Sequence, residues 1–286
     1  MRRFKRLGCG LCVVGLGCSQ VEDPSALQGE FDALTYNVHG LPSQITGDDT
    51  PGRMVQIAPL LEAFDVIGLQ EDFDDNNHEV LVSDASFDTK LWFSETVEED
   101  RVYGSGLSVL ARQPLVEGLH EHYTDCNGVF DGASDCLASK GFQVVRLQVG
   151  PEADQTLDVY NTHLEAGNGL EDDRARTAHV TQLLAALSGF SEGRAVLFLA
   201  DTNLKDSDPE DLIEITRLLE QANLVELCVE VGCPEPGRID RLLYRSSPSL
   251  SLTGVDWWVD ERFEDSEGGP LSDHDPIAGR FGWTVQ

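Results

Sequence analysis

The chain has 286 residues, and its 51 acidic residues against 20 basic ones give a formal net charge of −31. This length is enough to bury one sizeable core, and no internal repeat or linker divides the sequence into several domains. A charge of this sign repels polyanions, so the composition argues against tight binding of nucleic acid, which usually requires a basic surface.

The N-terminus resembles an export signal that spans residues 1–17. A basic segment, Met1–Arg6, precedes an apolar stretch that is too short to cross a bilayer. Cys18 follows at the position of the lipid-modified cysteine of bacterial lipoproteins, although Gly15 replaces the usual leucine. We expect export to a bacterial cell envelope, a lipid anchor at Cys18 and a tether over residues 18–30; secretion after ordinary signal cleavage is the alternative. Loss of the four basic residues of the signal would change the formal charge from −31 to −35.

Short apolar runs bounded by turn residues predict buried strands along the rest of the chain. They cover residues 31–34, 65–69, 157–160 and 195–199. A further strand is expected to contain Leu250, Leu252, Val255, Trp257 and Val259, with Trp257 pointing inward. For Trp258 two alternatives stay open, the core and a membrane interface, where tryptophan prefers to lie.

Helices are predicted between the strands. Residues 53–64 form the first, and another contains apolar residues at helical spacing from Val180 to Leu187. A later helix begins at Asp208-Pro209, because Asp caps helices well and Pro suits the first turn. Its apolar face is expected to carry Leu212, Ile215, Leu218 and Leu219.

A polar cluster follows each of the four apolar runs, and a fifth lies near the C-terminus. Because polar residues at consecutive strand ends meet at one rim, we expect these clusters to converge. They are Thr35-Tyr36-Asn37, Gln70-Glu71, Asn161-Thr162-His163, Asp201-Thr202-Asn203 and Ser272-Asp273-His274-Asp275. In the last cluster a histidine stands between two carboxylates, which can fix its tautomer and raise its basicity.

In this order the clusters, together with the segment Arg238-Ile239-Asp240-Arg241-Leu242-Leu243, resemble the endonuclease/exonuclease/phosphatase superfamily of metal-dependent phosphodiesterases. The resemblance extends over about residues 31–281, and its one departure is Ala200, where the family usually has Gly. It implies an α/β fold, a four-layer α/β sandwich with two packed mixed sheets flanked by helices. We expect one catalytic domain over residues 31–286.

The resemblance also implies roles for the clustered residues. Hydrolysis of a phosphodiester needs a cation on the phosphate and a base for water. Glu71 is the expected ligand of Mg²⁺, with Mn²⁺ or Ca²⁺ as alternative ions. Asn37 is expected beside it, where it would help to hold the metal or the scissile phosphate. His274 is the expected general base. Either Asp240 or Asp273 orients it, and Asp273 could instead face the metal.

The remaining cluster residues are expected to position water and bind phosphate. Asp201 and Asn203 would position the water, and Asn203 would also donate to the phosphate. His163 would donate to a nonbridging oxygen; a satisfied core histidine is the alternative. Phosphate contacts are also assigned to Asn37 and Lys140.

Four cysteines remain if the signal is removed and Cys18 is acylated. Each close pair encloses a loop that contains glycine, so Cys126–Cys136 and Cys228–Cys233 are the favoured disulfides. A zinc site is the alternative, but no histidine stands nearby at the usual spacing. The disulfides agree with an oxidising compartment.

Three segments resemble bacterial neutral sphingomyelinases, and this resemblance narrows the choice of substrate class. Lys140-Gly141-Phe142 follows a cysteine-rich loop, Thr162-His163-Leu164 precedes Ala166, and Gln70-Glu71-Asp72-Phe73-Asp74 matches a further block. We expect an exported monomeric phosphodiesterase that acts on a phospholipid headgroup in a membrane, and no nucleic-acid partner. An extracellular metal-dependent nuclease is the alternative, followed by a non-enzymatic surface binding protein.

Other polar residues near these blocks have simpler explanations. His120 and His122 are expected at a strand end, and His39 and His78 are expected only to line the rim of the site. An acidic loop accounts for Asp72, Asp74 and Asp75, with a second cation as the alternative.

Overall fold

A computed structural model describes residues 27–94, 97–98, 101–128 and 135–286 of the chain. The expected export signal, Cys18 and most of the tether lie outside these residues. The first strand begins at Gln28, before the position 31 at which we expected the domain to start.

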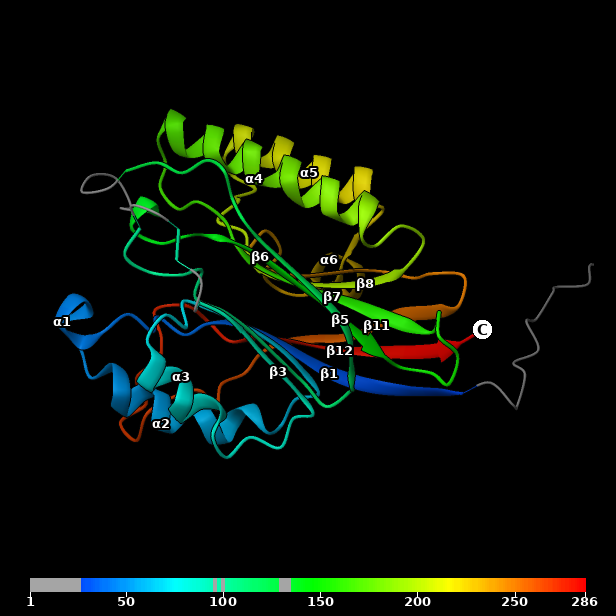
Figure 1. Cartoon of the computed structure of the whole chain (residues 1–286), viewed down its shortest axis with the longest axis horizontal. Coiled ribbons are helices and arrows are strands. Elements are labelled where there is room, and N and C mark those ends of the chain that lie inside the picture. Colours follow the sequence, from blue (N-terminus) through cyan, green and yellow to red (C-terminus); the bar gives the residue numbers. More distant parts are fainter. Residues whose placement is uncertain (1–26, 95–96, 99–100, 129–134) are drawn as a thin grey trace, which may run out of the picture.

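Two six-stranded sheets form the centre of the molecule (Figure 1). The first has the strand order β11-β12-β1-β2-β4-β3 and the second β5-β6-β7-β8-β10-β9. Both are mixed, because β1 pairs with β2 and β7 with β8 in parallel while their other pairings are antiparallel. The first sheet comprises β1 Gln28–Asn37, β2 Val66–Gln70, β3 Thr89–Phe93, β4 Leu107–Ala111, β11 Leu250–Val259 and β12 Ile277–Val285; the second comprises β5 Leu115–His122, β6 Gly141–Gln148, β7 Thr156–His163, β8 Ala195–Asp201, β9 Val225–Glu226 and β10 Asp240–Arg245.

Helices cover the outer faces of both sheets. In Figure 1, α2 and α3 lie on the side of the first sheet, and α4 and α5 lie together over the second. This arrangement confirms the predicted four-layer α/β sandwich. The helices are α1 Ser43–Thr46, α2 Thr50–Leu61, α3 Asp75–Val82, α4 Leu170–Gly189, α5 Pro209–Ala222 and α6 Leu227–Val231, with a 3₁₀ turn at Asp135–Leu137.

The core has three parts that follow these layers. One lies between the sheets and contains Val66, Leu197 and Phe281; the others lie between each sheet and its helices. The sheets are also joined by a buried hydrogen bond, in which Gln70 Nε2 donates to Asn161 Oδ1 over 2.7 Å. Residues of the expected strand ends therefore help to hold the two sheets together.

The predicted apolar face of α5 was wrong in part. Its cap is as expected, since the Asp208 carboxylate accepts a hydrogen bond from Glu210 N. Leu212, however, is 45% exposed, while Asp211 is buried. Asp211 Oδ1 lies 2.7 Å from Arg176 Nε of α4, and this buried ion pair turns the polar side of α5 toward its neighbour.

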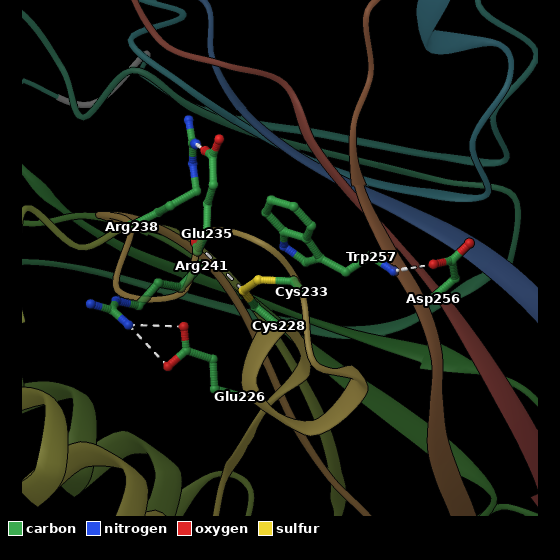
Figure 2. The surroundings of a disulfide bond; sticks show 8 residues. All are labelled: Glu226, Cys228, Cys233, Glu235, Arg238, Arg241, Asp256 and Trp257. Atoms are coloured by element: carbon green, nitrogen blue, oxygen red, sulfur yellow. Dashed lines mark hydrogen bonds and ion pairs between the residues drawn. A yellow bond between two sulfur atoms is a disulfide. The ribbon is translucent and has the colours of Figure 1, made fainter.

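Both predicted disulfides are present. Cys126–Cys136 closes the connection between β5 and β6, and Cys228–Cys233 links α6 to the segment that follows it. Trp257 is buried in the core between the sheets, as predicted, and Figure 2 shows its indole beside Cys228–Cys233. Trp258 packs, half-buried, against the core under α2.

The described part of the chain contains no helix with both the length and the apolar character needed to cross a bilayer.

A substitution at Gly68 of β2 would test how closely one sheet packs on the other. A Cβ atom there would lie 2.8 Å from Leu199 Cβ and 3.1 Å from Asn161 Oδ1 of the opposite sheet. We expect Gly68→Ala to lower the free energy of unfolding by about 1–3 kcal/mol through overpacking, measured by denaturant titration. Gly189→Ala is the control, because a Cβ at this end of α4 meets nothing within 4 Å. Equal stability of the two variants would contradict the close inter-sheet contact.

Candidate active site

The predicted polar clusters converge at one edge of the two sheets. Asn37 and Gln70 are adjacent at the ends of β1 and β2. In the second sheet Asp201 pairs with His163 on one side and with Asp240 on the other. These residues stand at strand ends, so side chains that are far apart in the sequence meet.

Asn37 connects the two sheets at this edge. Its Nδ2 donates to Glu71 Oε1 over 3.0 Å and to Asp201 Oδ2 over 3.1 Å. Its Oδ1 accepts a hydrogen bond from His39 N. One buried amide thus holds a carboxylate from each sheet.

Glu71 presents its second carboxylate oxygen to His39. The backbone of Glu71 has a φ of 58°, in the left-handed region, which directs the side chain out of the strand. His39 Nδ1 lies 3.6 Å from Glu71 Oε2 and 3.5 Å from Asp273 Oδ1. Burial raises the pKa of Glu71, but the hydrogen bonds from His39 and Asn37 and nearby positive charge outweigh it and lower the pKa to about 2. Glu71 is therefore ionised at neutral pH.

His39 has a larger part in this geometry than the sequence indicated. We expected it only near the rim, yet it contacts two of the proposed metal-site carboxylates. Its hydrogen bond to Glu71 raises its pKa, against the opposing effect of burial. The available sequence signal was its place two residues after Asn37 in the same block.

The oxygen donors around Glu71 fit a hard cation. Glu71 and Asp273 offer carboxylate oxygens on either side of His39, and the Asp273 side chain is 61% exposed. Mg²⁺ prefers one or two carboxylates and keeps several waters, which suits an open site of this kind. The Asn37 oxygen already accepts from His39 N, so Asn37 contributes here mainly by holding Glu71.

His274 lies between Asp240 and Asp201. Its Nδ1 is 3.0 Å from Asp240 Oδ2, and its Nε2 is 3.7 Å from Asp201 Oδ2. Burial lowers the pKa of His274, but the hydrogen bond and charge of Asp240, with the charge of Asp201, raise it overall to about 10. Burial and the charge of Asp240 raise the pKa of Asp201 to about 7. Of the two orienting residues left open by the sequence, Asp240 is the one that contacts the imidazole.

Asp201, Asp240 and His274 also form a group that could hold a metal ion. Each offers one ligand atom, and these atoms lie within 4.8 Å of one another. The sequence assigned this group to acid–base chemistry. Its geometry suits either a proton shared among the three or a cation.

His163, Lys140 and Asn203 surround Asp201. His163 Nε2 is 3.3 Å from Asp201 Oδ2 and 3.4 Å from Lys140 Nζ. Burial and the Lys140 charge hold the pKa of His163 well below its usual range, so its imidazole is neutral at pH 7. Lys140 Nζ and Asn203 Nδ2 both donate to the Leu164 carbonyl, and Asn203 N donates to Asp201 Oδ1. These residues fix the loop beside the carboxylate of Asp201.

The other polar residues have mainly structural partners. His120 and His122, at the end of β5, pack against the Phe93 ring. The Asp74 carboxylate caps α3. Asp72 is buried and accepts from His78 Nδ1 over 2.6 Å. The simpler sequence explanations therefore hold for the two β5 histidines, whereas Asp72 is a buried partner of His78 and not a solvated loop residue.

The Cys126–Cys136 loop is tied to this edge by a buried histidine. His179 Nε2 donates to the Asp125 carbonyl, and its ring stacks on Tyr123 with centroids 3.8 Å apart. Next to the disulfide, Asn127 N donates to the buried carboxylate of Glu165. No sequence signal indicated this anchor, because His179 lies within the regular pattern of α4.

The comparison with known proteins agrees with this arrangement. A model of the Endonuclease/Exonuclease/phosphatase family matches residues 34–274. A protein of Mycobacterium tuberculosis named sphingomyelinase is 27% identical over 280 residues, which cover 89% of this chain and 53% of that protein. The chain thus spans about half the length of the curated relatives it matches.

Solved structures with the same fold include proteins with different ligands. A beta toxin mutant from Staphylococcus aureus with bound magnesium ions is 15% identical, with a TM-score of 0.64 over 88% of this chain and 99% of that one. TDP2 of D. rerio, complexed with a single-strand DNA product, is 16% identical, with a TM-score of 0.62 over 88% and 98% of the two chains. At these identities the likeness shows the fold alone.

The buried anchor His179 predicts a pH dependence of stability. Burial lowers its pKa in the folded protein to about 4, against 6.5 as the ordinary value, so unfolding takes up a proton between these pH values. The pKa shift of His179 therefore contributes to the free energy of unfolding. This contribution is complete above pH 6.5 and is lost as the pH falls toward 4, by about 3 kcal/mol in total.

Denaturant titrations of the wild type and of His179→Gln from pH 7.5 to 4.5 would measure this contribution. The wild type should lose more stability than the variant over this range, whatever constant offset the lost packing adds. Parallel curves would contradict the assignment.

Proposed function

The chain belongs to the endonuclease/exonuclease/phosphatase family, and on this premise we propose that it is an exported, metal-dependent phosphodiesterase that hydrolyses a sphingomyelin-like phospholipid headgroup. The observation that carries the proposal is the convergence of His274, Asp240 and Asp201 beside Glu71 and Asn37. The similarity to a mycobacterial sphingomyelinase over 89% of this chain supports the lipid substrate.

The base in this proposal is His274. Asp240 holds Nδ1, which leaves Nε2 directed toward Asp201 and the phosphate side of the site. In this geometry His274 is protonated at neutral pH, so it must lose a proton before it can accept one from water. It loses that proton more readily when positive charge is bound beside it.

The remaining residues would bind the phosphate and position the water. Asp201 would orient the water, while Asn203, His163 and Lys140 would line the phosphate side. A magnesium ion held by Glu71, with Asp273 and the Asn37 amide beside it, would neutralise charge on the phosphate. Mn²⁺ and Ca²⁺ are alternative ions for the same oxygen donors.

Export would explain why four cysteines form two disulfides. Both disulfides agree with an oxidising compartment, and we propose that the mature protein lies at the bacterial cell envelope as a monomer. The anchor at Cys18 stays a prediction from the sequence.

His274→Ala should reduce turnover by about 10²–10⁴-fold without unfolding the protein, because it removes the base. The assay is release of phosphocholine from sphingomyelin vesicles, with circular dichroism as the check on folding. His120→Ala is the matched control and should stay within about threefold of wild type, a margin of roughly 0.7 kcal/mol. Retained activity in His274→Ala would remove His274 from the mechanism.

Chelation should abolish activity, and Mg²⁺ or Mn²⁺ should restore it. Glu71→Gln should raise the Mg²⁺ concentration needed for half-maximal activity by about tenfold or more, because the main carboxylate ligand is lost. Glu192→Gln, at an exposed position, should leave that concentration unchanged. Full activity in chelator would refute metal dependence.

Salt dependence separates the lipid substrate from nucleic acid. Hydrolysis of neutral sphingomyelin vesicles should far exceed cleavage of plasmid DNA. Any DNA cleavage should accelerate with salt, because ions screen the repulsion by a highly acidic protein over a Debye length of about 8 Å near physiological ionic strength. A phosphate-binding nuclease would instead weaken with salt through counterion release. Efficient DNA cleavage that falls with salt, without phosphocholine release, would favour the nuclease.

A further inference from the structure

A pocket of about 640 Å³ is lined by Phe73 and other residues that follow the proposed metal ligand Glu71 in the chain. Three aromatic side chains line it, together with two carboxylates and an amide. These lining residues are Phe73, Trp92, Tyr103, Asp74, Asp75 and Asn76. Phe73 follows Glu71 by two residues, so their Cα atoms are at most about 8 Å apart.

Trp92 is held firmly as one wall of this pocket. Its Nε1 donates to the Asp72 carbonyl over 2.8 Å. The His78 ring stacks on the indole, with centroids 4.4 Å apart and an interplanar angle of 8°. His78 is fixed in turn by the fully buried carboxylate of Asp72, at 2.6 Å. The indole is therefore positioned before any ligand binds.

Phe73 and Tyr103 form a second wall. Their ring centroids are 5.8 Å apart. Gly106 makes room for Phe73, because a Cβ at this position would lie 2.6 Å from the ring, and its φ of 65° also suits glycine. Tyr103 N donates to the Leu137 carbonyl, which ties this wall to the segment next to the Cys126–Cys136 disulfide.

The lining suits a large cation with an apolar surface. Aromatic faces attract quaternary ammonium groups through their negative quadrupole, and adjacent carboxylates add Coulomb attraction. Asp75 is exposed and Asp74 half-buried at the pocket. A strongly hydrated metal ion gains little from three rings, and the two carboxylates oppose the approach of a polyanion. The aromatic lining and the two carboxylates thus favour a trimethylammonium group.

We propose that this pocket binds the quaternary ammonium of a phosphocholine headgroup while the phosphate lies at the site of Glu71 and His274. The inference rests on the proposed function and adds to it a selectivity determinant, the ring of Trp92 with those of Phe73 and Tyr103. In phosphocholine only a two-carbon chain separates ammonium from phosphate, so the proposal requires a pocket close to the metal ligand, and Phe73 of the pocket lies two residues after Glu71.

Two soluble substrates test the selectivity, the p-nitrophenyl esters of phosphocholine and of phosphoethanolamine. Wild type should favour the choline ester in kcat/KM by about tenfold or more, since a cation–π contact is worth roughly 0.5–2 kcal/mol per ring. Trp92→Leu should lose most of this preference through KM for the choline ester and change the ethanolamine ester little. An equal loss for both esters would mean a structural role and would overturn the proposal.

Trp283→Leu is the matched control. Trp283 is also half-buried, but it pairs with Gly29 near the opposite end of β1 from Asn37, about 26 Å away along the strand. This variant should keep the choline preference. If Trp92→Leu does not fold, Tyr103→Leu and Asp75→Asn replace it, with the exposed Asp88→Asn as their control.

A binding measurement distinguishes failure of the pocket from failure of the proposed function. Tetramethylammonium titrated calorimetrically into His274→Ala should bind, and the double variant with Trp92→Leu should bind about tenfold more weakly. Binding without hydrolysis of either ester by wild type would support the pocket and reject the phosphodiesterase activity on lipid headgroups. Ester hydrolysis without tetramethylammonium binding would overturn the pocket alone.

Discussion

The hydrogen bonds of one buried amide organise the candidate site. Asn37 Nδ2 donates to Glu71 in its own sheet and to Asp201 in the opposite sheet. The amide is neutral and offers two donor hydrogens, so it can bring two acceptors together without adding charge. The distance between the proposed metal side and the proposed acid–base side of the site therefore depends on how the two sheets pack. Gln70 and Asn161 form a second buried hydrogen bond between the two sheets.

This arrangement places acidic side chains close together where they are buried from solvent. Asp201 and Asp240 are neighbours across β8 and β10, and both are buried. Burial and the charge of Asp240 raise the pKa of Asp201. Burial lowers the pKa of His274, but its hydrogen bond to Asp240 and the charge of both carboxylates outweigh burial and raise that pKa overall. A site of this kind stores electrostatic energy that a cation or a proton can relieve, which agrees with the proposed dependence on metal and with a histidine that exchanges protons. The aromatic pocket lined by Phe73, Trp92 and Tyr103 would extend the same preference for positive charge to the substrate.

The strands and most residues of the candidate site were predictable from residue type and order, whereas the four-layer architecture was predicted only from the family resemblance. Apolar runs that end in Asn37, Glu71, His163 and Asp201 identified the strand ends, because buried strands leave their polar residues at the rim. The short spacing of Cys126 and Cys136 indicated the disulfide, because a close pair of cysteines can close a local loop. The helix at Pro209 was located by its cap. Its buried face was misjudged, because the partner that buries Asp211 is Arg176 on another helix.

The sequence by itself determined which chemical groups are present and which strand carries each one. It could not choose between Asp240 and Asp273 as the partner of His274, and it gave His39 and Trp92 no distinct role. Those choices depend on tertiary structure: the pairing of β10 with β8 brings Asp240 to the imidazole, and the left-handed backbone at Glu71 turns its carboxylate toward His39. Sequence spacing fixes positions along one strand. Contacts between strands and sheets follow from register, packing and loop conformation, which are set only when the whole core forms.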